Sequence, residues 1–210
     1  MFDFNIDLSF GDKKDHLTKN KWFIIPQKRE SFLVKYKYAA GMAKELKVVK
    51  GTNAYSFVNG SFIFGDLIEA LFVENNWHTE KLTIATLSMS HENIDSLYNI
   101  LHGKYVDSLD LLISDYFFSH ERKLKGLIPY MYDQYKDFNF QLSILRSHCK
   151  IVCFKNEKNE YITIQGSANL RSSGNVEQIQ IVESKELYDY NTKILSDLVD
   201  KGKTIKKGVK

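Results

Sequence analysis

Apolar residues along the chain switch between the spacing of an α-helix and that of a β-strand. Apolar side chains recur at helical spacing in three segments: residues 66–73, residues 90–103 with Ser90 as N-cap, and residues of about 121–137, where Pro129 must start, kink or interrupt the helix. Two buried strands are predicted near these helices, at residues 82–87 and 109–114. This alternation of strands and helices predicts an α/β fold.

The last third of the chain changes to short strand-like runs. They lie at residues 140–146, 149–154, 161–164 and 178–182. Residues 155–160 are all polar, which is typical of a hairpin tip. The runs at residues 149–154 and 161–164 should therefore pair and bring residues 148 and 166 to the same end of a sheet. A final helix is predicted from an apolar stripe made of Leu187, Tyr190, Ile194, Leu195, Leu198 and Val199.

The organisation along the chain predicts a single domain. The sequence of 210 residues contains no internal repeat and no linker-like stretch. We therefore expect an N-terminal segment at residues 1–21, one α/β domain at residues 22–200 and a basic C-terminal tail at residues 201–210. Four phenylalanines are expected to pack in the core, and this role is favoured over one as base-stacking platforms: Phe57, Phe62, Phe64 and Phe72.

Composition narrows the class of protein. Hydrophobic residues make up 43% of the chain and proline occurs only twice, which excludes disordered and collagen-like proteins. No apolar run approaches the roughly 20 residues that a membrane-spanning helix needs, so we expect no membrane association. The first seven residues include acids and show no basic-then-apolar leader, which favours a cytoplasmic location.

The distribution of charge matters more than its sum. The formal net charge is +3, but residues 201–210 contribute five lysines and no acid, which leaves 24 basic and 26 acidic residues in the rest of the chain. The predicted domain is therefore slightly acidic, and any affinity for a polyanion must come from a local patch or from the tail. Alternatively, the tail only frays and adds solubility.

Histidine, lysine and small polar residues gather at the two predicted hairpin strands. His148 and Lys150 are two residues apart, so their side chains lie on one face of a strand. Residues 166–169, Gly-Ser-Ala-Asn, leave the partner strand close to them and add neutral donors beside a fixed positive charge. Such a set suits a phosphate, and an imidazole beside it can act as nucleophile or general acid. Glu177 could hold one ring nitrogen of His148.

These residues resemble the HKD signature of the phospholipase D superfamily. The likeness rests on His148-x-Lys150, Gly166-Ser167-x-Asn169 and Asn175-x-Glu177, and the fold it implies is a mixed β-sheet flanked by helices on both faces. The resemblance also implies roles for individual residues. His148 attacks phosphorus to give a phosphohistidine intermediate, Lys150, Ser167 and Asn169 contact the phosphate, and Glu177 orients the imidazole.

The chain departs from the family pattern at one position. Family members carry an aspartate shortly after the motif lysine, whereas residues 154–156 here are Phe-Lys-Asn. The catalytic residues expected from the resemblance are nevertheless present: His148, Lys150, Asn169 and Glu177. Gly166, Ser167 and Arg171 are expected to bind substrate, although a solvated surface role is equally open for Arg171, as it is for Arg146.

The reaction that the resemblance implies needs a second histidine, which the family supplies from a second copy of the motif. Residues 78–81 and 120–123 begin with histidine but have the wrong spacing for such a copy. A homodimer in which two His148 side chains face each other across the twofold axis is therefore predicted. No cofactor and no metal are expected, because the cysteines and the other histidines show no ligand spacing.

The histidines can also be interpreted without any role in catalysis. His148 would then be a core or edge residue, and the other histidines would have structural roles: His16, His78, His91, His102 and His120. Cys149 and Cys153 stand too far apart along a strand for a disulfide and are expected to be small core residues.

Three functions remain open. The favoured one is a metal-independent nuclease acting on DNA or RNA. The alternatives are a catalytically degenerate relative that binds nucleic acid or protein, and a lipid phosphodiesterase.

Overall fold

The computed structural model describes residues 20–25, 32–36, 39–58, 63–122, 126–171 and 175–207. The strands are β1 Asn20–Ile25, β2 Phe32–Tyr36, β3 Asn53–Val58, β4 Leu82–Thr86, β5 Ser108–Ser114, β6 Asn139–Leu145, β7 Ile151–Lys155, β8 Tyr161–Gly166, β9 Glu177–Glu183 and β10 Lys203–Lys207. The helices are α1 Ala39–Glu45, α2 Phe64–Asn75, α3 His91–His102, α4 Asp115–Glu121, α5 Leu127–Tyr135 and α6 Lys185–Lys201. Among the described residues, no helix has the length and apolar character needed to cross a bilayer.

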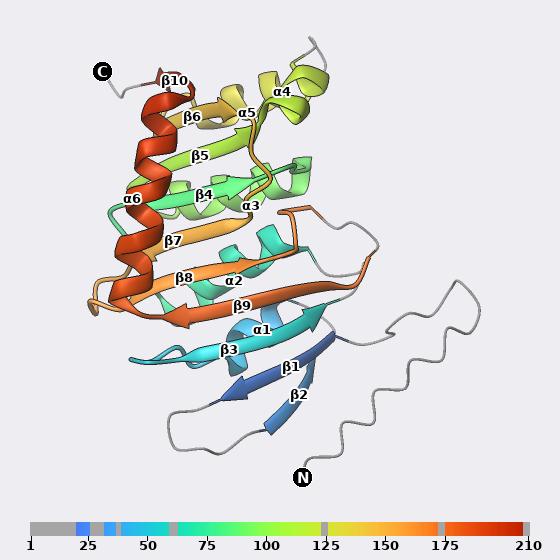
Figure 1. Cartoon of the computed structure of the whole chain (residues 1–210), viewed down its shortest axis with the longest axis vertical. Coiled ribbons are helices and arrows are strands. Elements are labelled where there is room, and N and C mark those ends of the chain that lie inside the picture. The colour runs from blue at the N-terminus through green and yellow to red at the C-terminus, as the bar shows by residue number, and fades with distance from the viewer. Residues whose placement is uncertain are drawn as a thin grey trace, which may run out of the picture.

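All of these strands belong to one mixed sheet, in the order β10-β6-β5-β4-β7-β8-β9-β3-β1-β2 (Figure 1). β4, β5 and β6 run parallel, because helical crossovers connect them: α3 between β4 and β5, and α4 and α5 between β5 and β6. β7 pairs antiparallel with β4 and continues through a tight turn into β8. The mixed α/β class predicted from the sequence is therefore confirmed.

Helices cover both faces of the sheet. α6 crosses one face, while α1, α2 and α3 lie behind the other (Figure 1). The larger core lies on the side of α1 to α3, where residues such as Leu67, Phe72 and Ile84 are fully buried. On the other face, Leu195 and Val199 of α6 form a small cluster with side chains of β4, β5 and β7. Burial of these two apolar layers is the main force that holds the helices onto the sheet.

The apolar stripe of the last helix is narrower than the sequence predicted. Leu195 and Val199 are buried, but Tyr190 is 65% exposed and Ile194 is 40% exposed. Only one side of α6 touches the sheet, so the flanking apolar positions face solvent.

Several other elements differ from expectation. The helix predicted over residues 121–137 is α5, in which Pro129 lies in the first turn, where a missing backbone N–H costs no helical hydrogen bond. The short helix α4 and the strands β1 to β3 were not predicted. Within the predicted basic tail, residues 203–207 form β10, an edge strand antiparallel to β6. The first nineteen residues, His16 among them, lie outside the described residues, as does Phe62.

Candidate active site

The residues singled out from the sequence meet at one edge of the sheet. β8 runs antiparallel to both β7 and β9, so the residues before β7, the end of β8 and the start of β9 lie side by side, on the right in Figure 1. His148 and Lys150 precede β7, Gly166 and Ser167 end β8, and Glu177 begins β9. The hairpin argument from the sequence therefore placed these side chains on the correct edge.

Lys150 and His148 contact each other directly. The Lys150 side chain is buried, at 8% exposed, and its Nζ lies 3.0 Å from His148 Nδ1. The same ammonium donates to the carbonyl oxygen of His148 at 3.0 Å. Burial lowers the pKa of Lys150 from its ordinary value, while the Glu177 carboxylate and the nearby Cys149 act in the opposite direction. A partly desolvated cation is thus held against an exposed imidazole.

A pocket of ≈ 380 Å³ opens at this edge. Its lining consists of His148, Cys149, Lys150, Ile151, Gln165, Gly166, Ser167, Gln178 and Gln180. The lining includes the Lys150 ammonium and the His148 imidazole and no carboxylate, and its other side chains are polar or apolar. A single phosphate group bound here would find positive charge on one side and uncharged polar groups on the other.

Gly166 and Ser167 are fixed by the neighbouring strand. A Cβ at position 166 would lie 2.0 Å from the carbonyl oxygen of Gln178, so a side chain has no room there. The Ser167 N–H donates to the same carbonyl at 2.9 Å, and Ser167 Oγ accepts from Gln178 N at 2.9 Å. Ser167 Oγ also donates to Glu177 Oε2. Glycine is therefore required by the approach of β9, and Glu177 positions the serine hydroxyl as well as facing the lysine.

Asn169 follows the end of β8 and does not belong to the pocket lining. Its neighbours Ala168 and Leu170 are buried, and Leu170 is tied down by a hydrogen bond from its N–H to Thr86 Oγ1 at 3.4 Å. The side-chain oxygen of Asn169 is buried and finds no hydrogen-bond partner among the described residues. Such an atom costs about 1–3 kcal/mol and often marks a place where a ligand binds. Arg171 is exposed on the next turn of this loop and is not part of the pocket lining.

Asn156, one of the three residues at the position where the family pattern has an aspartate, has a structural role in this chain. Asn156 lies at the opposite end of β7 from His148 and is only 2% exposed. Its Oδ1 accepts from the N–H groups of Lys158 and Glu160 at 3.1 and 3.0 Å, and its Nδ2 donates to Glu160 Oε2 at 2.7 Å. These bonds close the turn between β7 and β8. The missing acid therefore leaves the hairpin geometry intact.

The structure corrects two expectations and adds three residues. Cys149 is exposed in the pocket lining and is not a core residue, because the chain is not yet in the sheet at that position; Cys153 is buried. Phe57 is 53% exposed instead of being packed in the core, unlike Phe64 and Phe72. The sequence reasoning missed three glutamines of the lining: Gln165, Gln178 and Gln180. Their alternate positions in β8 and β9 were the available signal.

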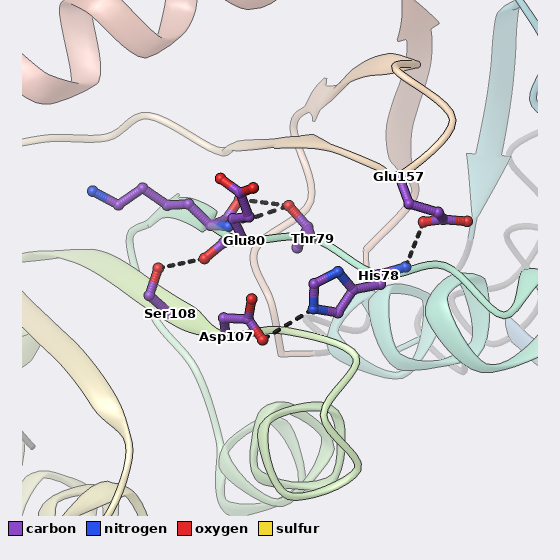
Figure 2. A network of polar contacts seen from close by, with 7 residues as sticks. His78, Thr79, Glu80, Asp107, Ser108 and Glu157 are labelled. Carbon is purple, nitrogen blue, oxygen red and sulfur yellow. Dashed lines mark hydrogen bonds and ion pairs between the residues drawn. The ribbon is translucent and has the colours of Figure 1, made fainter.

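A second polar cluster lies at the opposite end of the sheet (Figure 2). His78 Nε2 is 3.0 Å from Asp107 Oδ1, and the His78 N–H donates to Glu157 Oε2 at 2.7 Å. Ser108 Oγ donates to the carbonyl oxygen of Glu80 at 2.6 Å. These contacts join the β7–β8 turn to the starts of β4 and β5 around a pocket of ≈ 320 Å³, which gives His78 a structural role. In the part of the chain that the structure describes, no cluster of three or more His, Cys, Asp or Glu side chains could hold a metal ion.

The chain resembles known proteins in its structure. No protein-family model and no curated protein sequence matches the chain. Among solved structures, Nuc from Salmonella typhimurium, a phospholipase D family member, is 13% identical, with a TM-score of 0.46 over 61% of this chain and 84% of that chain. NucT from Helicobacter pylori is 14% identical, with a TM-score of 0.48 over 88% of this chain and 97% of that chain.

The chain is similar in fold to phospholipase D family members. A third solved structure, phosphatidylserine synthase from Haemophilus influenzae Rd KW20, is 15% identical, with a TM-score of 0.46 over 85% of this chain and 44% of that chain. This likeness concerns the fold and assigns no role to any side chain. The chemistry of the site is therefore argued from its own geometry.

Proposed function

We propose that the protein is a phosphodiesterase that cleaves DNA or RNA through a phosphohistidine intermediate, without a metal ion. The observation that carries this proposal is the contact between the buried Lys150 ammonium and the imidazole of His148, in a pocket that also holds the Ser167 hydroxyl. A cation that binds a phosphate oxygen and a nucleophile that reaches phosphorus must be neighbours, and these two are.

Binding of substrate would rearrange the contacts of Lys150. A phosphate oxygen is a stronger acceptor for the ammonium than the imidazole nitrogen, so the phosphate replaces His148 Nδ1 as its partner. His148 can then carry its proton on Nδ1, held by Glu177, and present an unprotonated Nε2. The Ser167 hydroxyl donates to the phosphate once it turns away from Glu177, and the Asn169 amide donates through its Nδ2. A bridging water would satisfy the buried Asn169 oxygen.

The chemical step transfers the phosphoryl group twice. The Nε2 lone pair of His148 attacks phosphorus, the P–N bond forms, and the bond from phosphorus to the leaving oxygen breaks. A second acid protonates that oxygen, and its conjugate base afterwards takes a proton from a water molecule that attacks phosphorus. The new P–O bond forms as the P–N bond breaks, which frees His148. We propose that this acid is His148 of the partner subunit in a homodimer. The exposed position of His148 at the rim of the pocket is compatible with such a contact.

Cleavage assays with chelator present would test this function. Plasmid DNA, RNA and phosphatidylcholine are incubated with the wild type, with His148→Ala and with a control, His102→Ala, which removes an exposed histidine at the end of α3. We expect nucleic-acid cleavage in chelator that His148→Ala abolishes and His102→Ala retains. Cleavage of lipid alone would favour a lipid phosphodiesterase. Binding of nucleic acid without turnover would favour a degenerate relative.

The homodimer requires a separate measurement. Light scattering coupled to gel filtration gives the molar mass in solution, and the proposal expects twice the mass of one chain at the concentrations at which cleavage is observed. An active monomer would contradict the proposed source of the second acid.

A further inference from the structure

The sheet face next to the phosphate pocket carries a row of polar side chains. Gln165 of β8 lies directly opposite Gln180 of β9, which in turn lies opposite Tyr55 of β3. Directly opposed residues point to the same face of a sheet, so the three side chains form a line across the strands. Gln165 is also opposite Ile151, whose side chain packs in the cluster under α6. The row therefore lies on the face that α6 crosses, at the end that α6 leaves open (Figure 1).

Hydrogen bonds fix the orientation of this row. Gln165 Nε2 donates to Gln180 Oε1 at 3.1 Å, and Gln180 Nε2 donates to the Tyr55 hydroxyl at 2.8 Å and to Asn53 Oδ1 at 3.1 Å. Both N–H groups of the Gln180 amide and its oxygen therefore have partners. Gln165 keeps its carbonyl oxygen and one N–H, for which the described residues offer no partner. It presents an acceptor and a donor side by side in the pocket lining.

An exposed aromatic ring flanks the same surface. Phe57 lies directly opposite Gln178, another residue of the pocket lining, and is 53% exposed. The face therefore combines an amide edge with an apolar ring. Planar heterocycles that carry hydrogen-bonding edges match this combination, because the ring can stack while the edge pairs with the amide.

We infer that Gln165 binds the edge of an unpaired nucleobase next to the scissile phosphate, and that the substrate is single-stranded nucleic acid. This inference rests on the proposed phosphodiesterase function. Adjacent strands are about 4.8 Å apart, so Gln165 on β8 is one strand away from the β7 end that holds Lys150, within reach of a base attached to a phosphate bound there. The pairing edge of each base carries a donor and an acceptor side by side. In a duplex that edge is occupied, and in a single strand it is free.

The test compares oligonucleotides with a substrate that has no base. Wild type, Gln165→Leu and Gln165→Met are assayed on a single-stranded oligonucleotide, on its duplex and on bis(p-nitrophenyl) phosphate, and binding of a fluorescent single strand is followed by anisotropy. The control is Gln141→Leu, a half-buried strand glutamine on β6, far from the pocket. We expect the wild type to prefer the single strand, and both Gln165 variants to lose about tenfold in kcat/KM and in affinity for it.

The outcomes separate the two proposals. Hydrolysis of bis(p-nitrophenyl) phosphate should fall much less than cleavage of the single strand in both Gln165 variants, because that substrate has no base edge for Gln165 to bind. If the wild type cleaves neither the oligonucleotides nor bis(p-nitrophenyl) phosphate, the proposed function falls, and the anisotropy series still decides whether Gln165 binds single strands. If both variants cleave and bind the single strand as the wild type does, or if the wild type prefers the duplex, the assignment of Gln165 is overturned. Parallel DNA and RNA oligonucleotides identify the polymer.

Discussion

Replacing Gly166 with alanine should break the packing that holds the site together. The added Cβ would meet the Gln178 carbonyl oxygen at 2.0 Å and its carbon at 2.9 Å, both of which are backbone atoms that no rotamer change can move. To restore a 3.0 Å separation the β9 backbone must shift by about 1 Å, which also stretches the 2.9 Å hydrogen bond from Ser167 N to that carbonyl. Overpacking of roughly 1–3 kcal/mol and a lost hydrogen bond of roughly 1 kcal/mol together predict a destabilisation of about 2–4 kcal/mol.

Urea unfolding and thermal melts measure this cost. For a chain of this length, the predicted loss corresponds to a fall in Tm of roughly 5–15 °C. Gly202→Ala is a matched control, because its Cβ would meet carbonyl oxygens only at 3.2 and 3.3 Å, and it should cost less than about 1 kcal/mol. Cleavage by Gly166→Ala should also fall at temperatures where the protein remains folded, since Ser167 moves with β9. A Gly166→Ala protein within about 0.5 kcal/mol of wild type would refute the reasoning.

Three further changes probe the lysine, the turn and the histidine. Lys150→Met should abolish cleavage. It should also raise the free energy of unfolding near neutral pH by roughly 0.5–2 kcal/mol, measured by urea unfolding, because it removes a partly desolvated cation. A less stable variant would contradict this reasoning. Because the folded pKa of Lys150 is lowered, wild-type stability should rise with pH as the lysine deprotonates below its ordinary 10.5, a slope that Lys150→Met lacks. Asn156→Ala should cost about 2–3 kcal/mol in urea unfolding because it removes the acceptor for two N–H groups of the turn, and a loss below about 0.5 kcal/mol would count against the proposed turn. Cleavage should follow a bell-shaped pH profile from a coupled histidine pair, and a rate that rises monotonically would point to a different mechanism.

The position of the site was predictable because it depends on local rules. His148 and Lys150 are only two residues apart and directly precede β7, and the polar turn at residues 155–160 forces β7 and β8 to pair. Together they bring residues 148 and 166 to one edge, and the structure has the His148–Lys150 contact and a shared pocket there.

The surroundings of the site depend on tertiary packing and were not predictable. Phe57 is apolar, and its sequence context does not reveal that α6 leaves the outer face of β3 uncovered. For the same reason, Gln165 and Gln180 could be placed on a strand face but not on an open one. The clash that requires Gly166 arises from β9, twelve residues further along, and its φ angle is not in the left-handed region, so the usual turn argument for glycine does not apply.

The order of the strands also has a consequence for how the molecule is made. β3 and β4 are consecutive in the chain, yet β7, β8 and β9 lie between them in the sheet. A nascent chain that has emerged from the ribosome only as far as β6 holds two separate pieces of sheet, with their edges unpaired. The gap closes once residues 151–183 arrive, and the same residues bring the lysine, the serine and the glutamate together. Assembly of the site is thereby coupled to synthesis of the chain through β9, and a product that ends with β6 contains none of these three side chains.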